Sequence, residues 1–386
     1  MIELLDEEKM LQDSIRDFFK KELEPVSDAI ENDHDYNTIK NLIKKMGDLG
    51  FLGTFFPKEY GGSDMSLLSR AIICEETARV NAGFDITLFA DIVLFARALS
   101  LHGSEAQKKK YLVSVIAGEK IASLAISEPE AGSDAFSIRS SAVKQGDNYI
   151  LNGNKTFITN APIADYIAVI CRTSKGQSKI KGGTWFILEK GMEGLSTGKP
   201  FNKLGMRSSP TGEIFMQDVR VPASQVLGDV DEGFYYMVVS LDVERLMEGA
   251  STVGIAQACL EASVAYAVER QAFGKSISSY QMIQEKIAEM AMGIEIARSY
   301  LYNLCRMADA GKKITKQASM LKLYSSTITM KTAQDAVQIH GGYGYMEDNK
   351  IARYFRDAKH QEIGAGTSEI QKTIIAREII KELTMK

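Results

Sequence analysis

The stretch QIHGGYGYMEDNKIARYFRDAKHQEIGAGTSEIQ, residues 338–371, joins two glycine-rich turns through a charged helical segment. A Gly-Gly-x-Gly turn spans residues 341–344, an Arg-x-x-x-Asp segment runs from Arg353 to Asp357, and a Gly-Ala-Gly-Thr turn follows at residues 364–367. No G-x-G-x-x-G pattern follows a predicted strand, so the stretch does not indicate a Rossmann nucleotide site. The domain to which this stretch belongs is decided by the segments that precede it.

Helical segments lie on both sides of this stretch and also begin the chain. Apolar residues recur with a helical period over residues 234–270, 279–310, 314–338 and 367–381. Residues 1–118 show the same period, with helices expected at 38–49 and 67–80. The first helix should end before Pro25, because proline disfavours a helix around it.

Residues 122–232, between the two helical parts, have a different pattern. Short β-branched or aromatic runs such as YIAVICR (166–172) and GTWFILE (183–189) are separated by Gly, Asn, Asp and Ser, which is typical of an antiparallel β-domain. The sequence therefore predicts an α+β multidomain chain. Its parts are an N-terminal α-helical domain at residues 1–120, a central antiparallel β-domain at 121–232 and a C-terminal helical bundle at 233–386.

Composition narrows the class of protein. The chain has 386 residues, 45% of them hydrophobic, and a net charge of 46 − 50 = −4, which favours neither nucleic acid nor a membrane surface as partner. The N-terminus MIELLDEEKM is acidic, unlike a secretory signal, and the most apolar stretch, residues 86–101, contains Asp91 and Arg97. Four cysteines without a C-x-x-C pair fit a reducing cytoplasm, and four scattered histidines predict no metal site.

Two segments together resemble one protein family, the acyl-CoA dehydrogenases, which are flavoenzymes that desaturate acyl-CoA thioesters. AISEPEAGSDAFS (125–137) matches the family pattern of Ser-Glu, two residues, then small-Gly-Ser-Asp. The opening stretch matches at seven further positions: Gln338, Gly341, Gly342, Gly344, Asp348, Arg353 and Asp357. The resemblance spans essentially the whole chain. It implies the family's architecture, with a β-barrel-like central domain and a C-terminal four-helix bundle.

The resemblance implies FAD as the cofactor and gives it contacts on the β-domain. The loop after the strand at 121–126 would cover the pyrimidine edge of the flavin, with contacts expected from Ile126, Ser127, Gly132 and Ser133. In KTFITN (155–160), the residue matching Phe157 packs on the isoalloxazine, and that matching Thr159 hydrogen-bonds the N5 region, which stabilises the reduced flavin.

The remaining FAD contacts implied by the family come from the C-terminal part and cross a subunit interface. The segment RQAFGK (270–275) resembles a loop whose arginine binds the flavin pyrophosphate of a neighbouring subunit. The expected residues are Arg270, Phe273, Gln338, Gly341, Gly342, Thr367 and Glu369. The resemblance therefore implies a homo-oligomer, with a tetramer as the family's usual form, and an electron-transferring flavoprotein or a similar protein as electron acceptor.

The catalytic base is not at its most frequent family position. There Ala365 stands where many relatives carry the glutamate that removes the substrate α-proton. A second family position for the base matches Glu244, next to Arg245, although Glu244 could equally be a surface glutamate or one that pairs with an arginine. Expected contacts to the acyl-CoA substrate are Ser133, Asp242, Arg245 and Gly366.

Asp91 is a third acid of interest. In GFDITLFADIVLFARAL (83–99) it lies on the apolar stripe of its helix, without a basic residue at i±3 or i±4. A buried carboxylate normally shifts its pKa or has a function, although the backbone or a distant arginine could also satisfy it. In the family this helix lines the acyl pocket.

Ala365 cannot remove a proton from the α-carbon, and Asp91 places an acid in the acyl pocket. We therefore expect a substrate whose acidic proton is not on the α-carbon. The chain most resembles alicyclic members of the family that oxidise cyclohex-1-ene-1-carboxyl-CoA. Asp91 would take the ring C3 proton while a hydride leaves C6, giving the 1,5-diene by 1,4-elimination. The alternatives are a short branched-chain, isovaleryl-type dehydrogenase that uses Glu244, an acyl-CoA oxidase, and a non-catalytic flavin-binding scaffold.

Overall fold

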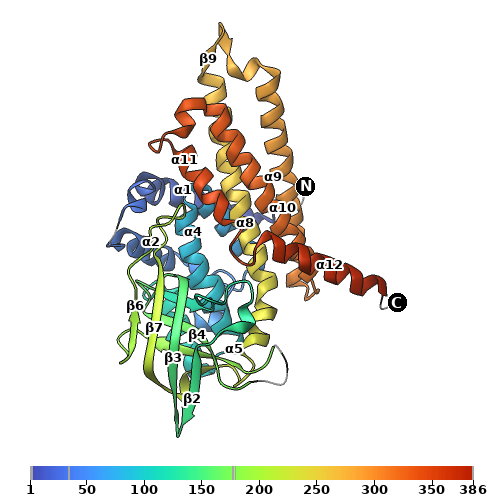
Figure 1. The fold of residues 1–386 in the computed structure, drawn as a ribbon. Helices are drawn as coiled ribbons and strands as arrows, with labels where there is room; N and C mark the ends of the chain where they lie inside the picture. The colour runs from blue at the N-terminus through green and yellow to red at the C-terminus, as the bar shows by residue number, and fades with distance from the viewer. Residues whose placement is uncertain (1–2, 34, 176–177, 179, 385–386) are drawn as a thin grey trace.

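The computed structural model describes residues 3–33, 35–175, 178 and 180–384, so that Met1, Ile2 and His34 lie outside the described residues. Figure 1 shows a β-domain below and a stack of long helices above it, with the N-terminal helices packed beside their junction. The predicted succession of helical, β and helical domains is confirmed.

The N-terminal domain contains the helices expected from the sequence. The first, α1 (Asp6–Glu22), ends before Pro25, and α2 (Asn37–Asp48) and α3 (Leu67–Val80) coincide with the predicted segments to within a residue. Shorter helices complete the domain: α4 (Ala82–Leu88), the π-helix η5 (Phe89–Ala96), α5 (Arg97–His102), α6 (Glu105–Gln107), the π-helix η6 (Lys108–Leu112) and α7 (Val113–Ile116).

The β-domain is one eight-stranded sheet in the order β6-β7-β3-β2-β4-β5-β8, with β1 paired to β4. Most neighbours are antiparallel, as predicted, whereas β1 and β2 each pair with β4 in parallel, so the sheet is mixed. Its strands are β1 (Ala122–Ala125), β2 (Ser141–Gln145), β3 (Asn148–Thr159), β4 (Tyr166–Arg172), β5 (Gly183–Glu189), β6 (Leu195–Thr197), β7 (Thr211–Pro222) and β8 (Val226–Leu227).

The C-terminal domain is built on α8 (Gly233–Glu269), α9 (Gln281–Asp309) and α10 (Thr315–His340), which pack on one another. A hairpin of β9 (Gln271–Ala272) and β10 (Lys275–Ser276) joins α8 to α9. The short helix η10 (Gly341–Tyr345), α11 (Lys350–His360) and α12 (Ser368–Thr384) follow, and α10 contacts all three. In Figure 1, α12 extends away from the body toward the C-terminus.

The core connects the domains and places three elements around one region. Helix α3 is buried from Leu67 to Ala78 and packs against α1, α4, α8 and α9. The π-helix η5 packs directly on β1, and also contacts α8. Consequently η5, β1 and α8 meet where the helical domains cover the sheet.

The π-helical winding of η5 corrects the α-helical period assumed from the sequence. A π-helix is wound more loosely than an α-helix and often occurs at functional sites. Asp91 is buried, as predicted, but its neighbour Leu94 is only half-buried.

Candidate active site

The first group of predicted FAD contacts lies where β1 ends and β3 bulges. The register of β3 against β7 shifts between Lys155 and Ile158, and within this irregularity Phe157 has a φ of 58° and is 71% exposed. A large apolar side chain held outward at a positive φ is unusual for a non-glycine residue. It provides an exposed aromatic face, as a residue that packs on a flavin requires.

Hydrogen bonds fix this surface. The backbone N–H of Thr156 donates to the carbonyl of Ser127 at 3.0 Å, which joins β3 to the residues just after β1. The Ser123 hydroxyl donates to the carbonyl of Thr159 at 2.6 Å, and the side chain of Thr159 is only half-buried. The structure thus brings Ser127, Phe157 and Thr159 to one edge, with Ile126 next to them.

A buried ion pair supports the loop after β1. Lys155 Nζ lies 2.8 Å from Glu128 Oε1 and also donates to the carbonyl of Ile126 at 3.0 Å. The Glu128 carboxylate further accepts from the backbone N–H groups of Arg139 and Ser140. The loop that carries Gly132 and Ser133 is therefore anchored at both ends, while these two residues themselves are exposed.

Asp91 is tied to this sheet edge by the backbone. The N–H of Ala122, at the start of β1, donates to Asp91 Oδ1 at 2.8 Å, and Asn160 donates to the carbonyls of Thr87 and Ala122 at 2.9 and 3.1 Å. Asp91 is fully buried, and its other oxygen, Oδ2, has no hydrogen-bond partner among the described residues. One carboxylate oxygen is thus bound to the sheet, and the other is not.

The electrostatics of Asp91 favour a bound proton. Burial raises its pKa well above the usual range, because a charged carboxylate loses its hydration. The hydrogen bond from Ala122 and the positive charge of Arg70 oppose this shift, whereas Asp165 adds to it. Arg70 could not be identified as a neighbour of Asp91 from the sequence, because it lies on another helix, α3.

Glu244 lies on α8 and is half-buried rather than on the surface. It accepts a hydrogen bond from the Ser240 hydroxyl, one turn earlier. Burial raises its pKa, and Ser240, Arg97 and Arg245 act in the opposite direction. Glu244 is therefore a second carboxylate whose ionisation is controlled by its surroundings.

Two predicted substrate contacts, Asp242 and Arg245, form a polar pair beside Glu244. Arg245 is buried, and its Nη1 lies 3.4 Å from Asp242 Oδ1. The other oxygen of Asp242 accepts from the Thr315 hydroxyl at 2.6 Å, which links α8 to the start of α10.

The loop that carries Ala365 is held in place by side chains of α10 and α12. Ala365 and Gly366 have φ values of 49° and 92°. Gln371 Nε2 donates to both their carbonyls, at 3.2 and 2.9 Å, and Lys322 Nζ donates to the Gly366 carbonyl at 3.0 Å. Position 365 is thus rigidly held but presents only a methyl group.

The other two residues predicted on this loop lie at the start of α12. Thr367 is half-buried and its hydroxyl accepts from the N–H of Ile370 at 3.4 Å, whereas Glu369 is exposed.

Three charged residues next to this region were not identified from the sequence. Arg70, Asp85 and Glu248 are each at most 1% exposed. A Cβ on Gly364 would lie 3.3 Å from Glu248 Oε1, so Glu248 borders the Ala365 loop. A charged residue inside an apolar run, such as Arg70 in LLSRAII, was the only available signal.

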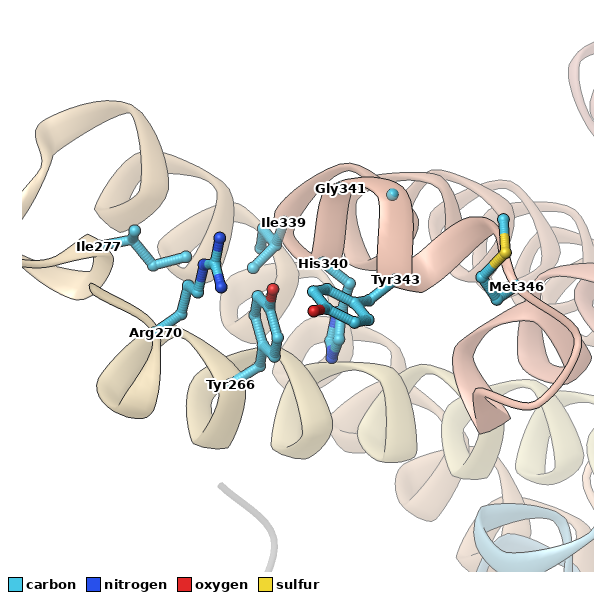
Figure 2. A pocket seen from close by; sticks show the side chains of 9 residues that line it. Tyr266, Arg270, Ile277, Ile339, His340, Gly341, Tyr343 and Met346 are labelled. Atoms are coloured by element: carbon cyan, nitrogen blue, oxygen red, sulfur yellow. The ribbon is translucent and has the colours of Figure 1, made fainter. Parts of the chain in front are cut away.

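Three residues of the second group of predicted FAD contacts, Arg270, Gly341 and Gly342, line a cavity of about 450 Å³ at the far end of α8. Figure 2 shows Tyr266 on α8 and Arg270, which directly follows that helix, facing Ile339, His340 and Tyr343. The Arg270 guanidinium lies 6.0 Å from the centre of the Tyr343 ring. Gly341 and Gly342 line the same cavity, while Gln338 is exposed on α10.

Most of the second group lies near the β9 hairpin at the top of Figure 1, away from the β-domain at the bottom, whereas Thr367 and Glu369 lie at the start of α12. Near that hairpin, Phe273 is 97% exposed. A fully exposed phenylalanine beside an arginine-lined cavity is suited to a contact with another molecule. This arrangement fits the expectation that the second group serves the FAD of a neighbouring subunit.

The residues present fit FAD. A Cβ built on Gly132, Gly341 or Gly342 would meet nothing within 4 Å, so these backbones are open to a ligand. Arg270 offers a cation for a pyrophosphate, and Phe157 offers a ring face for the isoalloxazine. In the described ranges, by contrast, no group of three or more His, Cys, Asp or Glu could hold a metal ion.

Comparison with known proteins decides the family. Three family models cover the chain: acyl-CoA dehydrogenase N-terminal domain at residues 5–119, middle domain at 123–219 and C-terminal domain at 231–380. The chain belongs to the acyl-CoA dehydrogenases. This acyl-CoA dehydrogenase is thus an FAD-dependent oxidoreductase that acts on CH–CH groups.

Several relatives match this acyl-CoA dehydrogenase along nearly its whole length. It is 40% identical to the probable acyl-CoA dehydrogenase YngJ of Bacillus subtilis (strain 168), over 98% of this chain and 99% of that protein. It is 39% identical to the mitochondrial isovaleryl-CoA dehydrogenase of Pongo abelii, over 97% and 89%. It is also 39% identical to the caffeyl-CoA reductase-Etf complex subunit CarC of Acetobacterium woodii, over 98% and 99%.

Solved structures agree with the sequence comparison. The butyryl-CoA dehydrogenase of Megasphaera elsdenii superposes with a TM-score of 0.94 at 37% identity, covering 98% of this chain and 100% of that one. The FAD complex of PigA gives a TM-score of 0.94 at 30% identity, covering 99% and 100%. None of the described helices is long and apolar enough to cross a membrane.

Proposed function

We propose that this acyl-CoA dehydrogenase uses Asp91 as its proton acceptor and oxidises an alicyclic unsaturated thioester of the cyclohex-1-ene-1-carboxyl-CoA type to the conjugated 1,5-diene. The observation that carries the proposal is the difference between the side chains at residues 365 and 91. Residue 365 carries a methyl group, whereas Asp91 is a fully buried carboxylate with one oxygen anchored and the other unpartnered.

The chemistry of such a substrate matches this contrast. In a 1-ene thioester the C3 hydrogen is acidified by conjugation with the carbonyl, so its removal does not need a base at the α-carbon. A base works best when its pKa lies near the working pH, and burial moves the pKa of Asp91 in that direction. Bound FAD supplies the two-electron acceptor that any such desaturation requires.

Other residues of the chain would orient the thioester and exclude water. Lys322 and Gln371 keep the 364–366 loop in one conformation through their bonds to its carbonyls. The proposed contacts to the acyl-CoA are Ser133, Asp242, Arg245 and Gly366.

We also infer a homotetramer that passes electrons to an electron-transferring flavoprotein in the cytoplasm. The separated FAD-contact groups support an oligomer, and a relative at 39% identity is a subunit of a reductase-Etf complex. The four cysteines are free and buried, which fits a reducing compartment.

Anaerobic mixing of the holoenzyme with acyl-CoAs tests the proposal, with reduction of the bound flavin followed by its absorbance. Cyclohex-1-ene-1-carboxyl-CoA should bleach the flavin faster than butyryl-CoA or isovaleryl-CoA. Faster reduction by isovaleryl-CoA would contradict the alicyclic assignment, and no reduction by any thioester would contradict the proposed activity altogether. Rapid peroxide formation in air would instead indicate an acyl-CoA oxidase.

A short branched-chain dehydrogenase that uses Glu244 is the second candidate. It is favoured by the half-buried position of Glu244, by its bond from Ser240, and by the 39% identity to an isovaleryl-CoA dehydrogenase. Loss of activity in Glu244→Gln with Asp91→Asn unaffected would select it. Membership of an enzyme family makes the non-catalytic scaffold the least supported alternative.

A further inference from the structure

Three charged side chains converge at the junction of α3, α4 and α8, next to the proposed site. They are Arg70 at 0% exposure, Asp85 at 1% and Glu248 at 1%. Helix α3 packs against both α4 and α8, so the three residues come from mutually contacting elements. None of the three has a part in the proton transfer proposed above.

Each of the three has buried polar atoms without a partner. Within the part of the chain that the structure describes, Nε, Nη1 and Nη2 of Arg70 have no hydrogen-bond partner, and the same holds for Asp85 Oδ1 and Glu248 Oε1. The second oxygen of Asp85 accepts from the Ser251 hydroxyl. Buried polar groups in native proteins are nearly always hydrogen-bonded, and an unpaired buried guanidinium is especially unfavourable. So many unpaired atoms in one place indicate a site that is completed by a ligand.

The position of this cluster connects it to the acyl group. The charge of Arg70 acts on both Asp85 and Asp91, so the cluster is electrostatically coupled to the proposed base. Glu248 lies against the Gly364 end of the loop that carries Ala365, and one turn beyond Glu244 on α8. The cluster is thus connected both to Asp91 and to the loop at residue 365.

We propose that Arg70, Asp85 and Glu248 form a subsite that recognises a hydroxyl group on the acyl part of the substrate. A hydroxyl oxygen accepts from the guanidinium of Arg70, and its hydrogen is donated to a free carboxylate oxygen, Asp85 Oδ1 or Glu248 Oε1. One small group therefore satisfies both kinds of unpaired atom. This inference rests on the proposed dehydrogenase activity and narrows its substrate to an oxygenated acyl group.

A neutral ligand group fits the charges better than an ionised one. An additional carboxylate would face Asp85, Glu248 and Asp91, and an additional cation would face Arg70 and Lys322, which acts on Glu248. Burial raises the pKa of Asp85 and of Glu248 to about 7, so that either carboxyl can donate as well as accept near neutral pH.

Matched pairs of thioesters test the inference on the wild-type holoenzyme. The probes are cyclohex-1-ene-1-carboxyl-CoA with its 4-hydroxy derivative, and 3-phenylpropionyl-CoA with 3-(4-hydroxyphenyl)propionyl-CoA. A site built to bind a hydroxyl strongly rejects the analogue that lacks it. At least one hydroxylated member should reduce the flavin with a kcat/KM about 100-fold or more above its partner.

The variant Arg70→Met removes the guanidinium at similar length and should bring that ratio to within about threefold of unity, since the hydroxyl then loses its donor. Arg220→Met, at an exposed arginine of β7, is the matched control and should keep the wild-type ratio. FAD content and oligomeric state are measured for both variants. If Arg70→Met does not fold, the kcat/KM ratios of the wild-type enzyme for the two thioester pairs decide whether the inference holds.

Two results would overturn the inference while leaving the proposed function intact: flavin reduction at equal rates within both pairs, or a hydroxyl preference that survives Arg70→Met. Faster reduction by a 4-amino or 4-carboxy ring derivative than by the 4-hydroxy compound would also overturn it. Absence of flavin reduction with every thioester would contradict the dehydrogenase proposal itself, so the two failures are distinguishable.

Discussion

Asp91 on η5 and Glu244 on α8 are the two candidate bases, and they are held in different ways. Asp91 is fully buried and accepts from a backbone amide of β1, a different domain. Glu244 is half-buried and accepts from Ser240 within its own helix. A cross-domain bond from a backbone group fixes a carboxylate relative to the sheet edge that carries the proposed flavin contacts, whereas a bond within one turn of a helix fixes it only relative to that helix.

The charges around the two carboxylates differ as well. Glu244 is influenced by two arginines, Arg97 and Arg245, which favour its ionised form. Asp91 has one arginine, Arg70, and a like charge, Asp165, so burial dominates its pKa. Burial thus raises the pKa of both carboxylates, and it is opposed by two arginines at Glu244 but by one arginine and a backbone hydrogen bond at Asp91.

The largest expected effect is that of Asp91→Asn on turnover. The asparagine keeps an oxygen for the Ala122 N–H but cannot take a proton, so kcat for cyclohex-1-ene-1-carboxyl-CoA should fall by ~10²-fold or more. Glu244→Gln is the paired control and should lower kcat by less than about tenfold. FAD content and oligomeric state should stay at wild-type levels, and near wild-type turnover in Asp91→Asn would reverse the assignment of the two carboxylates.

Next in size is a pH effect on stability that arises on the η5 side. The pKa of Asp85 is raised from 3.8 to about 7 in the folded protein, so the folded state binds more protons than the unfolded state in this interval. The free energy of unfolding should therefore fall as pH rises from about 4 to about 7. Asp85→Asn should flatten this fall by about 3 kcal/mol, measured by urea unfolding at several pH values.

Glu248, with a pKa of about 7, acts over the same range from the α8 side, so Glu248→Gln should give a separate and comparable flattening. A pH profile that neither substitution changes would show that these carboxyls do not titrate between the folded and unfolded states.

A smaller effect is expected when the missing carboxylate is restored. Ala365→Glu places an acid on the rigidly held loop, and should introduce or improve 1,2-oxidation of saturated butyryl-CoA by about tenfold. The backbone φ of 49° already belongs to a residue with a Cβ, so the change adds no new strain of that kind. Anaerobic flavin reduction measures the gain, and no gain would indicate that position 365 does not reach the α-proton.

The smallest effect should come from Ser240→Ala, which removes the hydrogen bond to Glu244. If Asp91 is the base, turnover should change by less than about threefold, since a single neutral-donor bond contributes about 1 kcal/mol. A pH–rate profile that shifts its apparent pKa upward in this variant would instead assign the titrating group to Glu244.

Much of this protein was predictable from periodicity and turn residues. The strands at 166–172 and 183–189 and the helix at 67–80 appear with the predicted bounds, because each is a regular run bounded by Gly, Asn or Asp. The parallel pairing of β1 with β4 was missed, because a strand run carries no mark of its partner. The π-helical winding of η5 was missed because apolar residues cover the segment on all sides and hide its period.

The sequence by itself determined the order of domains, the absence of a carboxylate at residue 365, and the burial of Asp91, because local composition and hydrophobic period control these features. Only the tertiary structure decided that Asp91 bonds to β1, that Glu244 is half-buried, and that Arg70, Asp85 and Glu248 converge. Each of these facts joins residues that are distant in the chain, and the strength of such an electrostatic contact depends on distance and burial. Neither the distance nor the burial can be read from a single segment of the sequence.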